Sequence, residues 1–207
     1  MNELKIEKIE PSSGYTVNPR YIFHSLRNSG WSVEACINEL IDNAIDAGAS
    51  KIDVGWEKHQ KNHKDEDQYY KFSCGDNGGG VIRVRMRPSF TELGTETTYE
   101  LESIGKYGVG GTSALVNLCE EGTIKIKSSA LETKETSLMQ ILHTLENQMP
   151  DISVEDKPWD NIPGVTIEID KVKSKVTEST LIKKFGVTYF PQYDRTKERK
   201  KKTFEIN

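Results

Sequence analysis

The sequence has little of what membrane insertion, secretion or disulfide stabilisation requires. No run approaches the about 20 consecutive apolar residues of a membrane-spanning helix. The N-terminal segment "MNELKIEKIEPSSG" has no apolar stretch of the length that a signal peptide needs. The 3 cysteines, Cys36, Cys74 and Cys119, are odd in number, widely spaced and without paired metal-ligand spacing. We therefore expect reduced thiols in a cytoplasmic protein that has no membrane partner.

A strong charge of either sign is also missing. The formal charge of −4 gives no indication of nucleic acid or an anionic membrane as an obligatory partner. The basic run at 197–202 is interpreted as a solvated tail. A length of 207 residues suits one large domain with a tail. We place the domain at 1–190, and a basic tail or the start of a following segment at 191–207.

Hydrophobic periodicity predicts alternating helices and strands. Ser32 is the predicted N-cap of a helix that runs from about Val33 to Ala47 and is closed by Gly48. The apolar residues at 138, 141, 142 and 145 have helical spacing, although a strand remains open there. The other predicted elements are a hairpin of strands 51–56 and 69–74, a short helix from Thr112, strands 123–128 and 164–170, a helix at 177–190 and the start of a strand at the end of the chain.

The first predicted helix contains the stretch "NELIDNAIDAGA", residues 38–49, in which polar and apolar residues lie on different faces. Glu39, Asn43 and Asp46 are separated by 4 and 3 residues, so they share a face. Asp42 lies beside them. Taken alone, such a face is better explained as the solvated side of an ordinary amphipathic helix than as the wall of a site.

A first glycine cluster, "DNGGG", follows a predicted strand and has an Asp-x-Gly-x-Gly pattern at Asp76, Gly78 and Gly80. Glycines let the backbone turn sharply and approach a ligand closely. A carboxylate there can accept a hydrogen bond from an exocyclic amine. A flexible turn explains the same residues equally well.

A second cluster, "GKYGVGG", places Gly105, Gly108 and Gly110 directly before a predicted helix. Free backbone N–H groups and the helix dipole make such a terminus an anion-binding site. The pattern is not a P-loop, because no Gly-Lys-Ser or Gly-Lys-Thr follows. Taken alone, a tight strand-to-helix turn is an equal alternative.

In this order and on these elements, the three motifs together resemble the GHKL ATPases, the family of DNA gyrase, the ninety-kilodalton heat-shock chaperone, histidine kinases and MutL. "NELIDNAIDAGA" is similar to the asparagine box of the family, and "DNGGG" and "IGKYGVGGTSAL" to its two glycine boxes. The resemblance covers about residues 30–170 and is nearest to the MutL-like and MORC-like ATPase domains. It implies an α/β two-layer sandwich, in which a mixed, mostly antiparallel sheet carries helices on one face, the Bergerat-type ATP-binding fold.

The resemblance also implies roles for single residues. Glu39 would be the general base for the attacking water, and Asn43 would hold Mg²⁺ through its amide oxygen. Asp76 would recognise the adenine amine, and residues 81–104 would form the ATP lid. The implied nucleotide-binding residues are Asn43, Asp46, Asp76, Gly78, Gly80, Gly105, Lys106, Tyr107, Gly108, Val109, Gly110, Gly111, Thr112 and Thr166.

Two of these positions depart from the usual pattern of the family. The late strand begins Gly164-Val165-Thr166 where the family often has Gly-Thr, so Thr166 reaches the adenine only with a shifted register. Lys106 either contacts phosphate or faces solvent, as surface lysines usually do.

The resemblance implies ATP binding with slow Mg²⁺-dependent hydrolysis to ADP and phosphate, used as a switch that closes the lid and promotes homodimerisation. The alternative is a nucleotide-gated binding module with negligible turnover, which the presence of Glu39 disfavours. A phosphotransferase of the histidine-kinase kind is disfavoured by the context of the four histidines. An additional domain or a protein partner is compatible with the sequence.

Overall fold

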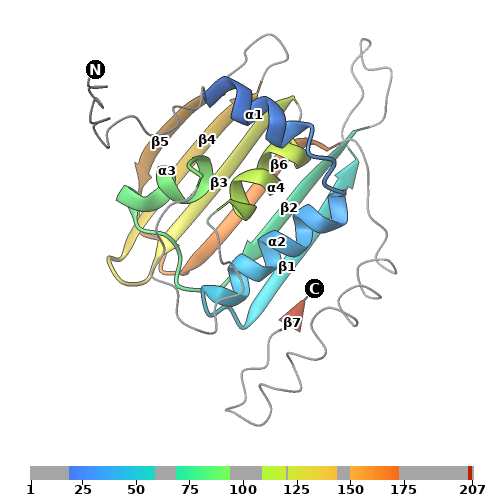
Figure 1. Ribbon diagram of the computed structural model, residues 1–207. Coiled ribbons are helices and arrows are strands. Elements are labelled where there is room, and N and C mark those ends of the chain that lie inside the picture. The colour runs from blue at the N-terminus through green and yellow to red at the C-terminus, as the bar shows by residue number, and fades with distance from the viewer. Residues whose placement is uncertain are drawn as a thin grey trace, which may run out of the picture.

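The computed structural model describes residues 19–58, 69–93, 109–119, 121–143, 150–172 and 205–206. The four helices in these described residues all lie on one face of a single sheet, as the resemblance implied (Figure 1). The helices are α1 (Pro19–Arg27), α2 (Val33–Asp46), α3 (Arg83–Thr91) and α4 (Gly110–Leu118). The strands are β1 (Lys51–Lys58), β2 (Tyr70–Asp76), β3 (Gly122–Ala130), β4 (Glu135–His143), β5 (Asp151–Lys157), β6 (Gly164–Val172) and β7 (Glu205–Ile206).

The sheet has the order β5-β4-β3-β6-β2-β1-β7. All neighbouring strands are antiparallel except β1 and β7, which pair in parallel. The sheet is therefore mixed and mostly antiparallel, which confirms the predicted fold class. The predicted hairpin is β1–β2. Strand β6, which follows β1 to β5 in the sequence, lies between β2 and β3.

The core lies between the helices and the inner face of the sheet. Strand residues alternate between the two faces, so every second residue enters this core. Among the described residues, the buried members of this core are uncharged and include Ile37, Leu40, Ile41, Ile52, Phe72, Leu115, Ile124, Ile126, Met139, Ile167 and Ile169. All three cysteines are free and buried, and burial raises the pKa of each thiol to about 12. The prediction of reduced thiols is compatible with these protonated side chains.

Residues 138, 141 and 142 belong to β4, so the strand alternative is correct for them, whereas residue 145 lies outside the described residues. Met139 and Ile141 enter the core, whereas Leu138 and Leu142 pair with Lys127 and Thr123 on the outer face. Apolar residues on both faces of one strand produced the apparent helical period. The helix predicted at 177–190 lies outside the described residues.

Helix α3 lies inside residues 81–104, the segment that the resemblance implies as the ATP lid. Met86 of α3 is fully buried, and Arg83 joins the first turn of α3 to the sheet by hydrogen bonds. The Arg83 backbone N–H donates to Glu135 Oε1 at 2.6 Å, and its Nε donates to Asp156 Oδ1 at 2.8 Å. Residues 94–104 lie outside the described residues.

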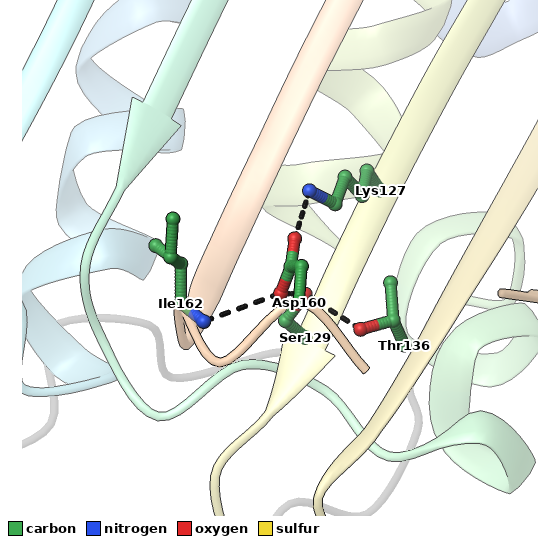
Figure 2. A network of polar contacts seen from close by, with 5 residues as sticks. All are labelled: Lys127, Ser129, Thr136, Asp160 and Ile162. Atoms are coloured by element: carbon green, nitrogen blue, oxygen red, sulfur yellow. Dashed lines mark hydrogen bonds and ion pairs between the residues drawn. The ribbon is translucent and has the colours of Figure 1, made fainter. Parts of the chain in front are cut away.

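The loop before β6 is fixed to the outer face of the sheet by a polar network (Figure 2). Asp160 forms an ion pair with Lys127 and accepts a hydrogen bond from Ser129 Oγ at 3.0 Å. Ser129 Oγ also lies 3.0 Å from Thr136 Oγ1, and the Ile162 N–H donates to Asp160 Oδ1 at 3.2 Å. The network sets the course of the chain immediately before Gly164.

In the part of the chain that the structure describes, no helix is long and apolar enough to cross a membrane.

Candidate functional site

Helix α2 presents its polar residues beside the N-terminus of α4. As predicted, Ser32 caps α2, since its side chain accepts a hydrogen bond from the Ala35 N–H at 3.2 Å. The opposite face of α2 is buried in the core, which fixes the rotation of the helix. Glu39 is therefore held half-buried, and Asn43, one turn later, is exposed.

The glycine pair at the start of α4 lies directly against these two side chains. A Cβ at Gly110 would overlap Glu39 Oε1 and Cδ and would lie 2.8 Å from Glu39 Oε2. A Cβ at Gly111 would lie 3.2 Å from Asn43 Nδ2. The structure thus brings together residues from the predicted asparagine box and from the predicted second glycine box.

Asp76 ends β2 on the inner, helix-covered face of the sheet, because it pairs with the buried Ile52. Its Oδ1 accepts a hydrogen bond from the Gly78 N–H at 2.7 Å. Gly78 is packed against the C-terminus of α2, since a Cβ there would lie 2.9 Å from the Ala47 carbonyl oxygen. The first glycine box therefore joins Asp76 to the end of the helix that carries Glu39 and Asn43.

Gly80 allows the glycine box to turn toward β3. Its φ of +70° lies in the left-handed region that favours glycine. A Cβ there would overlap the Ser129 carbonyl oxygen and lie 2.7 Å from the Ser129 carbonyl carbon. A side chain at this position would therefore push the box off the sheet.

Two carboxylates of the site have perturbed acidity. Burial raises the pKa of Glu39, and the negative charges of Asp42 and Asp46 raise it further. Burial also raises the pKa of Asp76, although hydrogen bonds from the backbone N–H groups of Gly78 and Val165 act in the opposite direction. Carboxyl groups with perturbed pKa values cluster at functional sites.

The remaining predicted residues have varied positions. Asp46 is exposed at the last turn of α2, and Val109 precedes α4 with its side chain 38% exposed. Thr112 is buried, and its Oγ1 donates to the Glu92 carbonyl oxygen at 3.1 Å, which links the start of α4 to the end of α3. Gly105, Lys106, Tyr107 and Gly108 lie outside the described residues.

The structure does not bring Thr166 together with the Asp76 side chain. Thr166 pairs with Gly75, so both lie on the outer face of the sheet, opposite to the face of Asp76. Val165 takes the inner position. Its backbone N–H donates a hydrogen bond to the Asp76 carboxylate, and its side chain packs on the core. The register between β2 and β6 shifts between Tyr70 and Phe72, away from Thr166, and a role of Thr166 at the adenine stays a prediction.

Sequence reasoning missed two residues that shape the site. Gly164 has a φ of +133°, and a Cβ there would overlap the Asp76 carbonyl oxygen. Asn77 fastens the same turn to β1, since its Oδ1 accepts from the Ser50 N–H at 2.9 Å and the Lys51 N–H at 2.8 Å. The signals were a glycine at the first position of a strand and an asparagine inside a glycine-rich turn.

Within the described residues, no cluster of three or more His, Cys, Asp or Glu side chains could hold a metal ion. The Asn43 side chain is exposed on α2, beside the start of α4. An exposed amide oxygen of this kind fits Mg²⁺, which takes oxygen ligands, keeps several waters and is often held largely by substrate phosphates.

Comparison with known proteins gives a family and a set of similar structures. Residues 31–178 match the family described as histidine kinase-, DNA gyrase B- and HSP90-like ATPase. The ATPase region of Saccharomyces cerevisiae topoisomerase II is a similar solved structure, at 14% identity and a TM-score of 0.45, covering 74% of this chain and 39% of that one. The same region bound to dexrazoxane gives the same values of 14%, 0.45, 74% and 39%.

A comparison with curated proteins found no significant match. The present chain spans about two fifths of the topoisomerase region that it resembles, at 39% of its length. The family match, in contrast, includes α2, the first glycine box, α4 and β6, and it extends over more than half of the sequence. This chain therefore belongs to the histidine kinase-, DNA gyrase B- and HSP90-like ATPases.

Proposed function

We propose that this chain binds ATP together with Mg²⁺ and hydrolyses it slowly to ADP and phosphate. One observation carries the proposal: the carboxylate of Glu39 and the amide of Asn43 both lie at the glycine-rich N-terminus of α4. A general base, a metal-ligating oxygen and an anion-binding helix terminus are the three groups that phosphoryl transfer to water requires.

Asp76 is the proposed acceptor for the exocyclic amine of adenine. Hydrogen bonds from the backbone N–H groups of Gly78, at 2.7 Å, and Val165 hold the carboxylate in one orientation. A carboxylate has about four lone pairs, so it can accept a further hydrogen bond from the ligand. Adenine would lie near the first glycine box, and the phosphates would extend along α2 toward Gly110 and Gly111, where backbone N–H groups favour anions.

Asn43 is the proposed protein ligand of Mg²⁺, whose positive charge would offset the negative charge that the phosphates carry. The Asn43 side chain is exposed and one helical turn from Glu39, so the metal-binding and proton-accepting groups would act on the same part of the ligand. Asp46, on the same face of α2, is proposed to contribute negative charge near this position.

Glu39 is the proposed general base. As water oxygen attacks the γ-phosphorus, Glu39 takes a proton from that water, the bond from phosphorus to the bridging oxygen breaks, and ADP leaves. The raised pKa of Glu39 makes its carboxylate a stronger base than an exposed glutamate. The shift arises from burial and from Asp42 and Asp46, all features of the folded chain.

We further propose that bound ATP closes a lid formed by residues 81–104 and promotes dimerisation. Of this segment the structure describes residues 81–93, which include α3. Support comes from the hydrogen bond between Thr112 Oγ1 and the Glu92 carbonyl oxygen at 3.1 Å, which joins this part of the segment to the start of α4. A contact between the lid and the γ-phosphate would then affect both α3 and α4.

The test is a comparison of binding and turnover in matched variants. Glu39→Gln should retain ATP affinity in calorimetry and lose phosphate release, whereas Asn43→Ala should lose the Mg²⁺-dependent part of the affinity. Glu34→Gln is the control, because Glu34 lies in the first turn of α2 and on a different face.

Full turnover in both site variants would contradict the assignment of these roles. ATP binding without measurable turnover in the wild-type chain would favour the alternative of a nucleotide-gated binding module. Absence of ATP binding would refute the proposal as a whole.

A further inference from the structure

The contact between the start of α4 and the polar face of α2 is closer than helix packing alone requires. At Gly110, the volume that a side chain would fill is occupied by the Glu39 carboxylate: a Cβ would overlap Oε1 and Cδ and lie 2.8 Å from Oε2. At Gly111, a Cβ would lie 3.2 Å from Asn43 Nδ2, a tight contact without overlap. Gly110 therefore faces the Glu39 side chain, and Gly111 faces the Asn43 side chain.

Both helices are anchored, so this contact cannot be relieved by a simple shift of α4. Ala114, Leu115 and Leu118 of α4 are buried in the core, as are Ile37 and Ile41 of α2. The Ser113 side chain and backbone N–H both hydrogen-bond to the Val109 carbonyl oxygen, at 2.7 and 3.0 Å, which fixes the first turn of α4. An added methyl group at Gly110 would have to displace the Glu39 carboxylate.

We propose that Gly110 is a positioning residue for Glu39: the absence of a side chain at Gly110 sets where the carboxylate stands relative to the attacking water. Gly111 plays the same part, with more tolerance, for the amide of Asn43. This inference rests on the proposed ATP hydrolysis and assigns these two glycines a task besides close approach of the backbone to phosphate.

The two tasks of Gly110 predict different results for Gly110→Ala. If the glycine only lets phosphate approach the backbone, the variant loses ATP affinity along with turnover. If it positions Glu39, affinity for a non-hydrolysable ATP analogue is largely kept and the rate falls. Misplacing a reacting group by about 1 Å can cost about 100-fold in rate, so we expect a loss of about 10- to 100-fold.

A double-mutant cycle with Glu39→Asp separates positioning from a general structural effect. Aspartate is shorter by one carbon–carbon bond, about 1.5 Å, and withdraws the carboxylate from the space that the added methyl group would enter. With glycine kept at position 110, Glu39→Asp should slow hydrolysis. In the Gly110→Ala background, the same change should leave the rate equal or higher, so that the effects on the two backgrounds differ in sign or size.

Gly55→Ala is the matched control. A Cβ at Gly55 would lie 2.6 Å from Ser73 Oγ, which is also a close contact with the movable tip of a polar side chain, but on the outer face of the sheet. Single-turnover phosphate release, affinity for the ATP analogue and thermal unfolding are measured for all variants. Gly55→Ala should change none of the rates.

Additive effects in the cycle, or equal losses of affinity and rate in Gly110→Ala, would overturn the positioning role. If Gly110→Ala unfolds the chain, Glu39→Asp must restore cooperative unfolding, and failure to do so counts against the inference. A wild-type chain that does not hydrolyse ATP refutes the proposed function and this inference with it. A wild type that does, with Gly110→Ala unaffected, refutes this inference alone.

Discussion

Replacing Asp76 with asparagine separates nucleotide recognition from folding, because the two side chains have almost the same volume. Asp76 Oδ1 accepts from the Gly78 N–H at 2.7 Å and the carboxylate also accepts from the Val165 N–H, so the proposed hydrogen bond to adenine is a third one. Asparagine would replace one carboxylate oxygen with an NH₂ group and would so leave a donor opposite a donor. A hydrogen bond to a charged group contributes about 1.5–3 kcal/mol, so ATP and ADP should bind about 10- to 150-fold more weakly.

The effect of Asp76→Asn on stability should have the opposite sign. Burial raises the pKa of Asp76 above its ordinary value of 3.8, so the folded state carries the cost of an ionised buried carboxylate at neutral pH. Asparagine removes this charge. The free energy of unfolding at pH 7 should therefore be unchanged or higher, and the difference from wild type should vanish below the ordinary pKa, where both states are protonated.

Asp160→Asn is the matched control for this experiment. Like Asp76, Asp160 accepts a hydrogen bond from the backbone N–H two residues later in the chain, here that of Ile162 at 3.2 Å. Asp160, however, lies on the outer face of the sheet (Figure 2). The hydrogen bond from Lys127 lowers the pKa of Asp160, so its charge stabilises the fold above the ordinary pKa. Asp160→Asn should thus lower stability at neutral pH, lose that difference as pH falls through the folded-state pKa, and leave ATP affinity unchanged.

Isothermal titration calorimetry gives the affinities, and urea unfolding between about pH 3 and pH 7, a range that spans the ordinary carboxyl pKa, gives the stabilities. Unchanged ATP affinity in a folded Asp76→Asn variant would remove Asp76 from the nucleotide site. A large loss of stability at pH 7 would instead refute the argument from burial, because it would mean that the charge of Asp76 stabilises the folded chain.

Three further predictions concern turnover, the turn before β6 and the lid. Glu39→Gln should lower the rate of phosphate release by about 10²- to 10⁴-fold while ATP affinity is retained; a rate close to that of wild type would rule out a general base at this position. Gly164→Ala should lower the free energy of unfolding by about 2–6 kcal/mol in urea titrations, since it adds unfavourable positive φ and overlap with backbone; a change within the error of the titration would contradict the close approach to Asp76. A non-hydrolysable ATP analogue should protect the predicted lid, residues 81–104, from hydrogen exchange more than ADP does, since a ligand shifts an equilibrium only by its differential affinity for the two states. Equal protection would mean that this segment does not sense the γ-phosphate.

The elements that sequence reasoning identified are those whose own residues specify them. Helix α2 has an N-cap at Ser32 and one continuous apolar face, and β1 and β2 alternate in polarity on either side of a polar connection. The pairing of Glu39 with Asn43 also follows from helical spacing alone. The predicted motifs therefore indicated, before any tertiary contact was known, which residues the structure brings together at the start of α4.

The elements that were missed depend on distant partners. Helix α3 contains Pro88 and buries mainly Met86, and its first turn is stabilised by Glu135 and Asp156 from the sheet. Strand β5 is a polar edge strand in which only Ile152 and Val154 pack on the core. Local pattern carries little information about such elements, because tertiary contacts and not their own periodicity determine them.

Helix α1 was missed for the same reason. Two of its side chains pack against the buried His143 of β4. The Phe23 ring stacks on the imidazole with 5.3 Å between the ring centroids, and Arg27 Nη2 lies 3.2 Å from His143 Nδ1. Burial and the charge of Arg27 lower the pKa of His143 to about 4, so the ring is neutral at physiological pH and can accept from Arg27. None of these contacts is visible in the segment around the helix.

The central position of β6 has a consequence for how the chain folds during synthesis. The hairpin β1–β2 and the three strands β3, β4 and β5 are each local in sequence, but they meet only across β6, which the ribosome makes after all of them. Until β6 emerges, Asp76 of β2 and Ser129 of β3, against which Gly80 packs, belong to separate half-sheets. Closure of long loops slows folding, so insertion of β6 should be the rate-limiting step, and a chain ended before residue 164 should form neither a complete sheet nor a nucleotide site.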